Sequence, residues 1–136
     1  IDLQLAISGG GSGSQSVAAL APTTSGESFA AGEAVYIKAA DGKAYKANNI
    51  FTREQANILG VAKNAAASAD LPVTVVIRGP FDGYTGLTVG SDYFLDVDGG
   101  KTTTPPGGGG LYSVFIGQAI TDTTMDVQPS PPMLTT

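Results

Sequence analysis

Glycine and proline interrupt this sequence so often that only short elements fit between them. Glycine supplies 19 of the 136 residues and proline supplies 8, and both residue types favour turns and end regular structure. The runs between these turns are rich in valine, isoleucine, leucine and tyrosine, which is typical of strands. The sequence therefore predicts an all-β fold, a small antiparallel β-barrel or sandwich of single-domain size.

The predicted strands share alternating or β-branched apolar residues between two turn signals. They cover residues 2–7, 34–37, 43–47, 58–62, 73–77, 93–95, 112–120 and 124–127. A short helical turn is predicted after Thr52, because Thr52 and Gln55 have the spacing of a capping box. We expect an N-terminal arm and Gly/Ser linker over residues 1–15, the β-domain over residues 16–128, and an extended proline-rich tail over residues 129–136.

A repeat with an offset of 57 residues relates the two halves of the predicted domain. The matched positions are Tyr36 with Tyr93, Asp41-Gly42 with Asp98-Gly99, and Gly60-x-Ala62 with Gly117-x-Ala119. Each half reads as a hairpin with an Asp-Gly turn, followed by a strand whose glycine permits a bulge or a close approach of backbones. Two such halves would form one barrel around a pseudo-twofold axis. A chance match of few positions is the alternative.

The first sixteen residues, IDLQLAISGGGSGSQS, join an alternating apolar run to a glycine- and serine-rich run. A phosphate-binding loop is excluded, because no lysine follows these glycines as the G-x-x-x-x-G-K-[ST] pattern requires. Gly/Ser composition indicates a flexible connector, and Leu3, Leu5 and Ile7 would share one face of a strand ahead of it. We predict an arm that adds to a sheet edge of a neighbouring subunit, or alternatively folds back on its own domain.

The other chain end offers a second apolar pair, Met133 and Leu134, after a proline-rich run. Prolines keep such a segment extended, so it is either a frayed end or a second docking segment. The residues predicted to form an assembly interface are Leu3, Leu5, Ile7, Met133 and Leu134. Between the termini, residues 101–110 (KTTTPPGGGG) are predicted to form a surface loop whose prolines block strand pairing.

The stretch DYFLDVDGG comes nearest to a metal site, because Asp92, Asp96 and Asp98 place carboxylates beside glycines as calcium loops do. The favoured interpretation is a hairpin turn in which Asp98-Gly99 supplies the positive φ angles, so no metal is predicted. Tyr36, Tyr84 and Tyr112 are interpreted as core or rim aromatics rather than a sugar-stacking platform.

The composition excludes several classes of function. Histidine and cysteine are absent, which removes imidazole catalysis, thiol catalysis and disulfides. The net charge is −5 and the basic residues are scattered, which argues against nucleic-acid binding. No apolar run approaches the roughly 20 residues of a membrane-spanning helix. No acid–base pair stands out, so we expect neither an enzyme nor a cofactor.

Four segments carry a resemblance to a known group of proteins. They are AGEAVYIKAADGKAYKAN, ILGVAKNAAASADLPVTVVIRG, GLTVGSDYFLDVDGGKTTTPP and VFIGQAITDTTMDVQP. Their order resembles that of the small β-barrel modules of tailed-bacteriophage virions, which include capsid decoration (cement) proteins, head fibres and tail-fibre segments. The resemblance implies a non-enzymatic virion protein, often a homotrimer, whose N-terminal segment attaches it to the major capsid protein or another virion protein. It brings no catalytic residues with it.

Two other functions stay open at this point. The chain would serve in an extracellular filament if each arm completed the sheet of the next subunit. It would serve as a carbohydrate- or receptor-binding adhesin module if the loops over residues 82–84 and 92–100 bound a ligand. Its expected location is the virion in the first interpretation and the extracellular space or cell surface in the other two.

Overall fold

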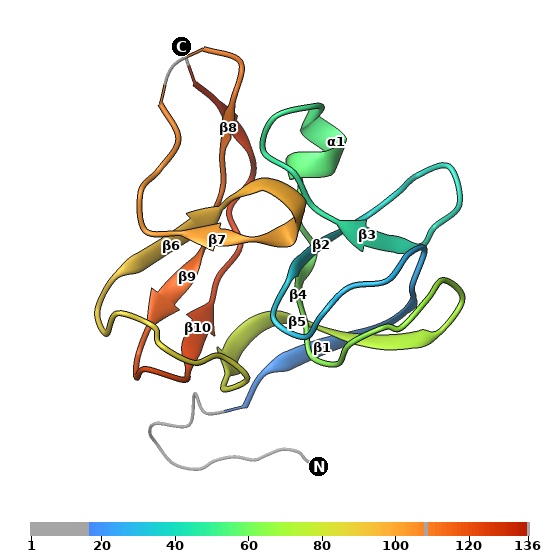
Figure 1. Ribbon diagram of the computed structural model, residues 1–136, viewed down its shortest axis with the longest axis horizontal. Helices are drawn as coiled ribbons and strands as arrows, with labels where there is room; N and C mark the ends of the chain where they lie inside the picture. The colour runs from blue at the N-terminus through green and yellow to red at the C-terminus, as the bar shows by residue number, and fades with distance from the viewer. Residues whose placement is uncertain (1–16, 108, 136) are drawn as a thin grey trace.

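The computed structural model describes residues 17–107 and 109–135, and almost all regular structure in them is β (Figure 1). The predicted all-β antiparallel class is therefore confirmed. The strands are β1 (Ala19–Thr24), β2 (Ala34–Ile37), β3 (Ala44–Lys46), β4 (Gly60–Ala62), β5 (Pro72–Phe81), β6 (Asp92–Leu95), β7 (Lys101–Thr102), β8 (Tyr112–Ser113), β9 (Phe115–Ala119), β10 (Met125–Val127) and β11 (Met133–Leu134). The helical elements are α1 (Arg53–Ala56) and a 3-10 turn over Val97–Gly99.

One antiparallel sheet forms most of the molecule. Its strands follow the order β3-β2-β4-β5-β10-β9-β6-β7, β1 pairs with β5 beside this path, and β11 pairs with β8 in a separate small sheet. The sheet curves so that the segments beside its two end strands touch: Gly99 N, ahead of β7, donates to Ala47 O, after β3, at 2.6 Å, and Asp98 N donates to Asn48 Oδ1 at 2.8 Å. Strands β3 and β7 themselves do not pair. The result is a half-barrel around one inner core.

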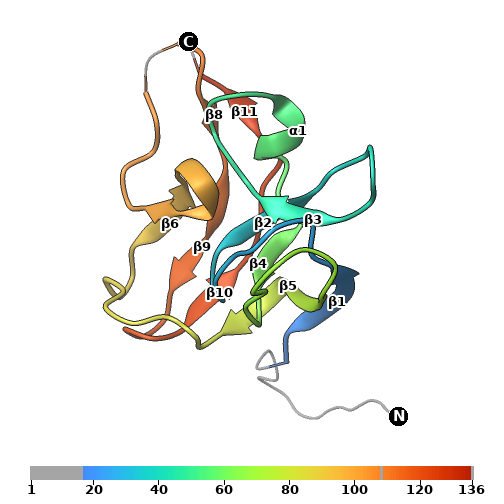
Figure 2. The same cartoon turned by 45° about the vertical axis from the view of Figure 1, so that its right-hand side comes forward.

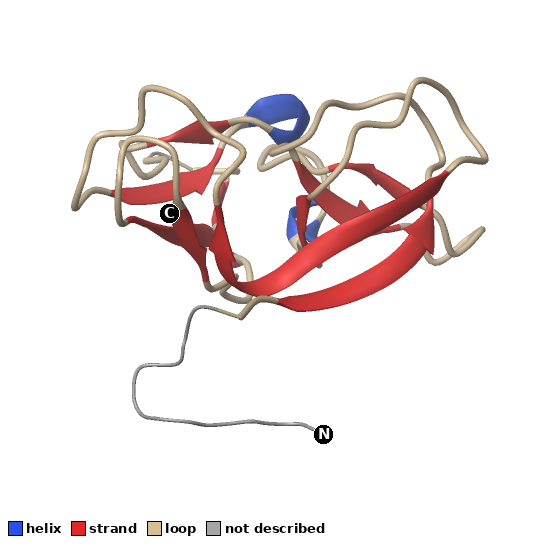
Figure 3. Cartoon of the chain, turned by 90° about the horizontal axis from the view of Figure 1, so that it is seen from below, coloured by secondary structure: helices blue, strands red, loops and turns tan. Residues whose placement is uncertain are grey.

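The strand order confirms the predicted repeat. Strands β2 and β3 form a hairpin, β4 pairs with β2, and β5 pairs with β4. In the same way, β6 and β7 form a hairpin, β9 pairs with β6, and β10 pairs with β9. We call the first set the first half and the second set the second half. Tyr36 and Tyr93 occupy matching positions and are both buried in the inner core. The two halves lie side by side in Figure 3, and β5 connects them through its pairing with β10.

The two repeated glycines confirm the predicted close approach of backbones. A Cβ atom built on Gly60 would overlap the carbonyl oxygen of Val76 on β5, and one built on Gly117 would overlap that of Asp126 on β10. The residue after each glycine shows where the halves differ. Val61, after Gly60, is buried in the inner core, whereas Gln118, after Gly117, is exposed. A register shift at Tyr93/Phe94 accompanies this difference, since a slip by one residue turns a strand's side chains to the other face.

The first half has a second core on its outer face. Phe29, buried to 5% exposure, packs there under the loops that flank it, and its backbone exchanges two hydrogen bonds with Ala66 at 2.9 and 3.0 Å. The members of this outer core are Phe29, Val35, Ala44, Ala62, Ala66, Val73 and Val75. On the second half, Phe94 alternates with inward-facing Tyr93 and Leu95 and is only half-buried, against Phe115 at 5.9 Å between ring centroids.

Strand β5 changes partner at Gly79. Its residues up to Arg78 pair with β1, whereas Gly79–Phe81 pair with β10. Gly79 has a φ of +101°, and a Cβ there would lie 2.8 Å from the Cα of Ala18. A side chain at this position would collide with the incoming chain, so glycine lets the segment before β1 cross β5 closely. The strands β1 and β10 therefore separate at this point.

Several predicted elements differ in extent. The run at 73–77 lengthens into β5 through Gly79 and Pro80, and the run at 112–120 divides at Val114 into β8 and β9, which belong to different sheets. The prediction that residues 101–110 do not pair was wrong for Lys101–Thr102, which form β7 opposite Phe94 and Leu95. Strand β1 was not predicted, because its sequence, ALAPTT, carries little apolar bulk and a proline.

The predicted helical turn is confirmed, but its capping box is only half formed. Thr52 Oγ1 accepts a hydrogen bond from Gln55 N at 3.2 Å, as an N-cap should. The Gln55 side chain is instead engaged with Tyr36, and its buried Oε1 has no partner. Ala56 anchors the turn because it is fully buried in the inner core.

Candidate assembly surface

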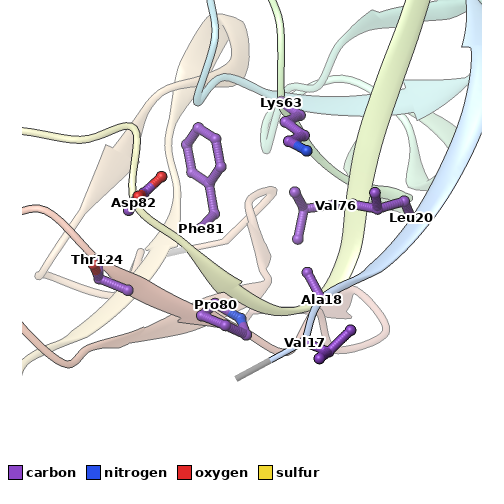
Figure 4. A pocket seen from close by; sticks show the side chains of 9 residues that line it. All are labelled: Val17, Ala18, Leu20, Lys63, Val76, Pro80, Phe81, Asp82 and Thr124. Carbon is purple, nitrogen blue, oxygen red and sulfur yellow. The ribbon is translucent and has the colours of Figure 1, made fainter. Parts of the chain in front are cut away.

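A groove of about 520 Å³ opens where the chain enters the β-domain (Figure 4). It lies where β1 and β10 separate along β5, so the partner change at Gly79 is what creates it. The side chains that define it are Val17, Leu20, Lys63, Val76, Phe81 and Asp82.

The floor of the groove is the inner core itself. Val76 and Phe81 belong to that core and are 1% and 6% exposed. Leu20 lies opposite Val76 across the β1–β5 ladder, so both side chains project from the same face of the sheet. Leu20 is 46% exposed and Val17 is 81% exposed. The groove therefore combines a core-like floor with exposed apolar side chains at its rim.

Charges of opposite sign complete the rim. Lys63 follows β4 and Asp82 follows β5, and Figure 4 shows them on two sides of the Phe81 ring. A smaller groove of about 330 Å³ lies nearby, with Val17 in both; its polar lining includes Arg78, Asp126 and Gln128. Such an apolar floor with a few charged rim groups suits an extended amphipathic segment.

A second apolar surface lies at the opposite end of the molecule, around α1, β8 and β11 (Figures 1 and 2). We call it the C-terminal patch; it comprises Ile50, Phe51, Met133 and Leu134. Phe51, Met133 and Leu134 are 65%, 71% and 60% exposed. The patch is held together by backbone pairing, because β11 pairs with β8, and Tyr112 N in β8 donates to Asn49 O at 2.7 Å.

The structure describes two of the five predicted interface residues, Met133 and Leu134. Leu3, Leu5 and Ile7 lie outside the described residues. Met133 and Leu134 pair with Ser113 and Tyr112 of the same chain, so the tail is not frayed there, while their side chains stay exposed. Sequence reasoning missed the groove, because its lining comes from several segments that are distant in the sequence, and a glycine-proline pair inside β5 reads as a strand end.

The three aspartates that came nearest to a metal site are not brought together as one. Asp96 Oδ1 accepts from Val97 N at 2.9 Å and so caps the 3-10 turn. Asp98 and Gly99 have φ angles of +52° and +75°, which confirms the turn interpretation. Asp92 is exposed at the start of β6. Within residues 17–107 and 109–135, no group of three or more acidic residues could hold a metal ion.

The tyrosines are core and rim residues, as predicted. Tyr36 and Tyr84 are buried, and Tyr112 packs against the inner core. The Tyr84 hydroxyl donates to Gly32 O at 2.7 Å, and burial raises the pKa of that hydroxyl well above 10.0. Lys101 Nζ lies 4.6 Å from the centre of the Tyr84 ring. The loop over residues 82–84 therefore uses its aromatic side chain internally instead of presenting it to a ligand.

The comparisons with known proteins add no family. A scan against protein-family models and a search of curated proteins found no match to this chain. No helix within the described ranges has the length and apolar character that a membrane crossing requires. The function is therefore inferred from the residues and their arrangement.

Proposed function

We propose that this protein is a non-enzymatic structural subunit of a tailed-bacteriophage virion, a capsid decoration (cement) or fibre module. It attaches through its N-terminal arm, with Leu3, Leu5 and Ile7 as the apolar contacts, and Met133 and Leu134 add a second contact. Its partners are further copies of itself, as a homotrimer, and the major capsid protein or another virion protein.

The observation that carries this proposal is the position of the exposed apolar side chains. Among the described residues, six of the ten exposed large apolar side chains lie in the groove rim or the C-terminal patch: Val17, Leu20, Ile50, Phe51, Met133 and Leu134. The elements that carry these two surfaces lie at opposite ends of the half-barrel (Figure 1). Burying such side chains on a neighbour stabilises an assembly by about 25 cal/mol per Å² of apolar area. A subunit that presents apolar surface at both ends can contact a copy at one end and the particle at the other.

The test compares the intact chain, a chain lacking residues 1–14, and a triple variant L3S/L5S/I7S. We expect a defined oligomer for all three by light scattering after size exclusion, and co-sedimentation with capsids that lack the protein for the intact chain alone. Gln4→Ser is the matched control, because Gln4 lies between the apolar positions and its change should leave attachment intact. Full attachment of the truncated chain would contradict the proposal.

A filament joined by strand exchange is the second candidate. The outer edge of β1 pairs with no other strand among the described residues, and such an edge can accept a strand from a neighbour. Pro22 is tolerated within β1 because this is an edge strand. Open-ended polymers that disappear when residues 1–14 are removed would favour the filament over the closed oligomer.

A further inference from the structure

We propose that, in the free subunit, residues 2–7 occupy the groove beside β1 of their own chain. Leu3, Leu5 and Ile7 would face the floor formed by Val76 and Phe81. The inference deepens the proposed function and rests on it in one respect, because the docked segment is the one that attachment would use. The groove would thus cover the arm's apolar face until a partner takes it.

The chemistry of the two surfaces matches. In an extended strand the side chains of Leu3, Leu5 and Ile7 fall on one face over about 13 Å. The groove offers an apolar floor continuous with the inner core, and Ala18 already packs against that core at the point where the chain enters. The arm's next apolar residues would therefore extend a contact that the described residues have begun.

Charge favours the same placement. Asp2 is the only charged residue among the first sixteen, and Lys63 at the rim is a cation that it can reach from a strand lying in the groove. Asp82 lies across the rim from Lys63 (Figure 4). The ends of the strand are thus not equivalent, because an aspartate beside Lys63 is attracted and an aspartate beside Asp82 is repelled.

The connector makes the chain's own arm the favoured occupant. Residues 8–16 are nine in number and consist of glycine, serine and one glutamine, which corresponds to an end-to-end distance of roughly 16 Å for a flexible chain. Val17, where this connector ends, is itself part of the groove rim. A short flexible tether gives an effective concentration of about 1 mM. Against a chain at about 1 μM that is not part of the same oligomer, docking within the chain is therefore favoured about a thousandfold.

The experiment uses paramagnetic broadening in the full chain. Because the sequence has no cysteine, Asp82→Cys gives a single attachment point for a nitroxide at the rim and leaves Lys63 unchanged. We expect loss of amide peak intensity for residues 2–7. Thr103→Cys, an exposed position in the loop after β7 of the second half, is the matched control label and should leave these peaks unchanged.

A mixture separates docking within one chain from docking between chains. Isotope-labelled cysteine-free chain is mixed with unlabelled, spin-labelled chain, and the proposal predicts no broadening of residues 2–7. Broadening in the mixture would overturn the proposal in favour of strand exchange. Equal intensities with labels at positions 82 and 103 would overturn it as well. The capsid co-sedimentation assay is independent of both measurements. Failure of this inference and failure of the proposed attachment can therefore be told apart.

A charge swap tests the orientation. Lys63→Glu should lower the ratio of docked to free arm about twofold to fivefold, the range for an exposed ion pair. The double variant D2K/K63E should restore the broadening. Leu20→Ser, at the half-exposed rim, should weaken docking without unfolding the domain. Broadening that is indifferent to all three changes would contradict the proposed contacts.

Discussion

The two halves of the half-barrel share a strand order but differ in how they are covered. The outer face of the first half lies under its own loops and carries a second core, whereas the outer face of the second half leaves Phe94 and Phe115 half-buried. The loop between β4 and β5 is what allows this, because it carries Ala66 to Phe29, and no comparable segment joins β9 to β10. Equal topology is therefore combined with unequal burial in the two halves, and we expect their stabilities to differ.

The sharpest way to break this comparison is to empty the outer core. Phe29→Ala should lower the free energy of unfolding by about 3–5 kcal/mol, the cost of truncating a buried phenylalanine. Phe115→Ala removes a half-buried ring and one aromatic contact, so its cost should be roughly 1–2 kcal/mol. Urea unfolding followed by circular dichroism measures both.

Phe29→Leu serves as the control, because it keeps most of the apolar volume and should cost less than about 1.5 kcal/mol. If Phe29→Ala and Phe115→Ala had equal effects, the outer core would contribute nothing that the open face lacks, and the comparison would fail.

The repeated glycines test what the halves have in common. Gly60→Ala and Gly117→Ala each force a methyl group into a carbonyl oxygen of the adjacent strand, so both should destabilise by about 1–3 kcal/mol, as overpacking does. Gly107→Ala is the matched control, because nothing lies within 4 Å of the added carbon. It should stay within about 0.5 kcal/mol of the unmodified chain. A tolerated alanine at Gly117 alone would show that the second half has room that the first half lacks.

The positions of the strands could be predicted from the sequence to a greater extent than the packing of their side chains. The Asp-Gly turns, the Gly-x-Ala strands and the valine-rich run at 73–77 are local signals, and each identified a real element. The direction that a strand faces is not local, because the register shift at Tyr93/Phe94 turns Gln118 outward where Val61 points inward. The sequence alone does not tell which of two matching strands is shifted.

The candidate surface was predicted in part, for a related reason. Met133 and Leu134 were predicted as assembly contacts, which stays a prediction, and their side chains are exposed in the structure. The groove depends on β1, whose alanines and proline give no strand signal, and on Gly79, whose role appears only when Ala18 crosses it. An edge strand that is defined by its partner leaves little trace in its own residues.

The two Asp-Gly turns sharpen the comparison at smaller scale. Gly42 and Gly99 both have positive φ, but nothing lies within 4 Å of a Cβ on Gly42, whereas one on Gly99 would lie 3.0 Å from Ala34 O. Gly42→Ala should therefore cost about 1 kcal/mol for the backbone alone, and Gly99→Ala about 2 kcal/mol. Asparagine tolerates this backbone region, so Gly42→Asn should recover most of the loss. Gly99→Asn should not recover the stability lost in Gly99→Ala. If asparagine recovered stability at both turns, the first half would not confine the second turn.

The first turn is held by side chains, and its pH response gives the smallest predicted effect. The Tyr45 hydroxyl donates to Asp41 at 2.5 Å, and this hydrogen bond raises the pKa of Tyr45 to about 12 and lowers the pKa of Asp41 below 3.8. Since the tyrosine pKa is raised on folding from 10.0, the bond stabilises the fold fully below pH 10 and is lost as the pH rises towards 12. The aspartate pKa is lowered, so the same bond is also lost as the pH falls below 3.8.

Asp41→Asn should bring the pKa of Tyr45 back towards 10.0. Ultraviolet titration of tyrosinate detects this change, and subtracting the titration of Tyr45→Phe isolates the contribution of this residue. The second turn has Thr102 where the first has Tyr45, so it should show no such alkaline transition. An unchanged titration in Asp41→Asn would mean that the raised pKa of Tyr45 has another cause and that the hydrogen bond to Asp41 does not distinguish the two turns.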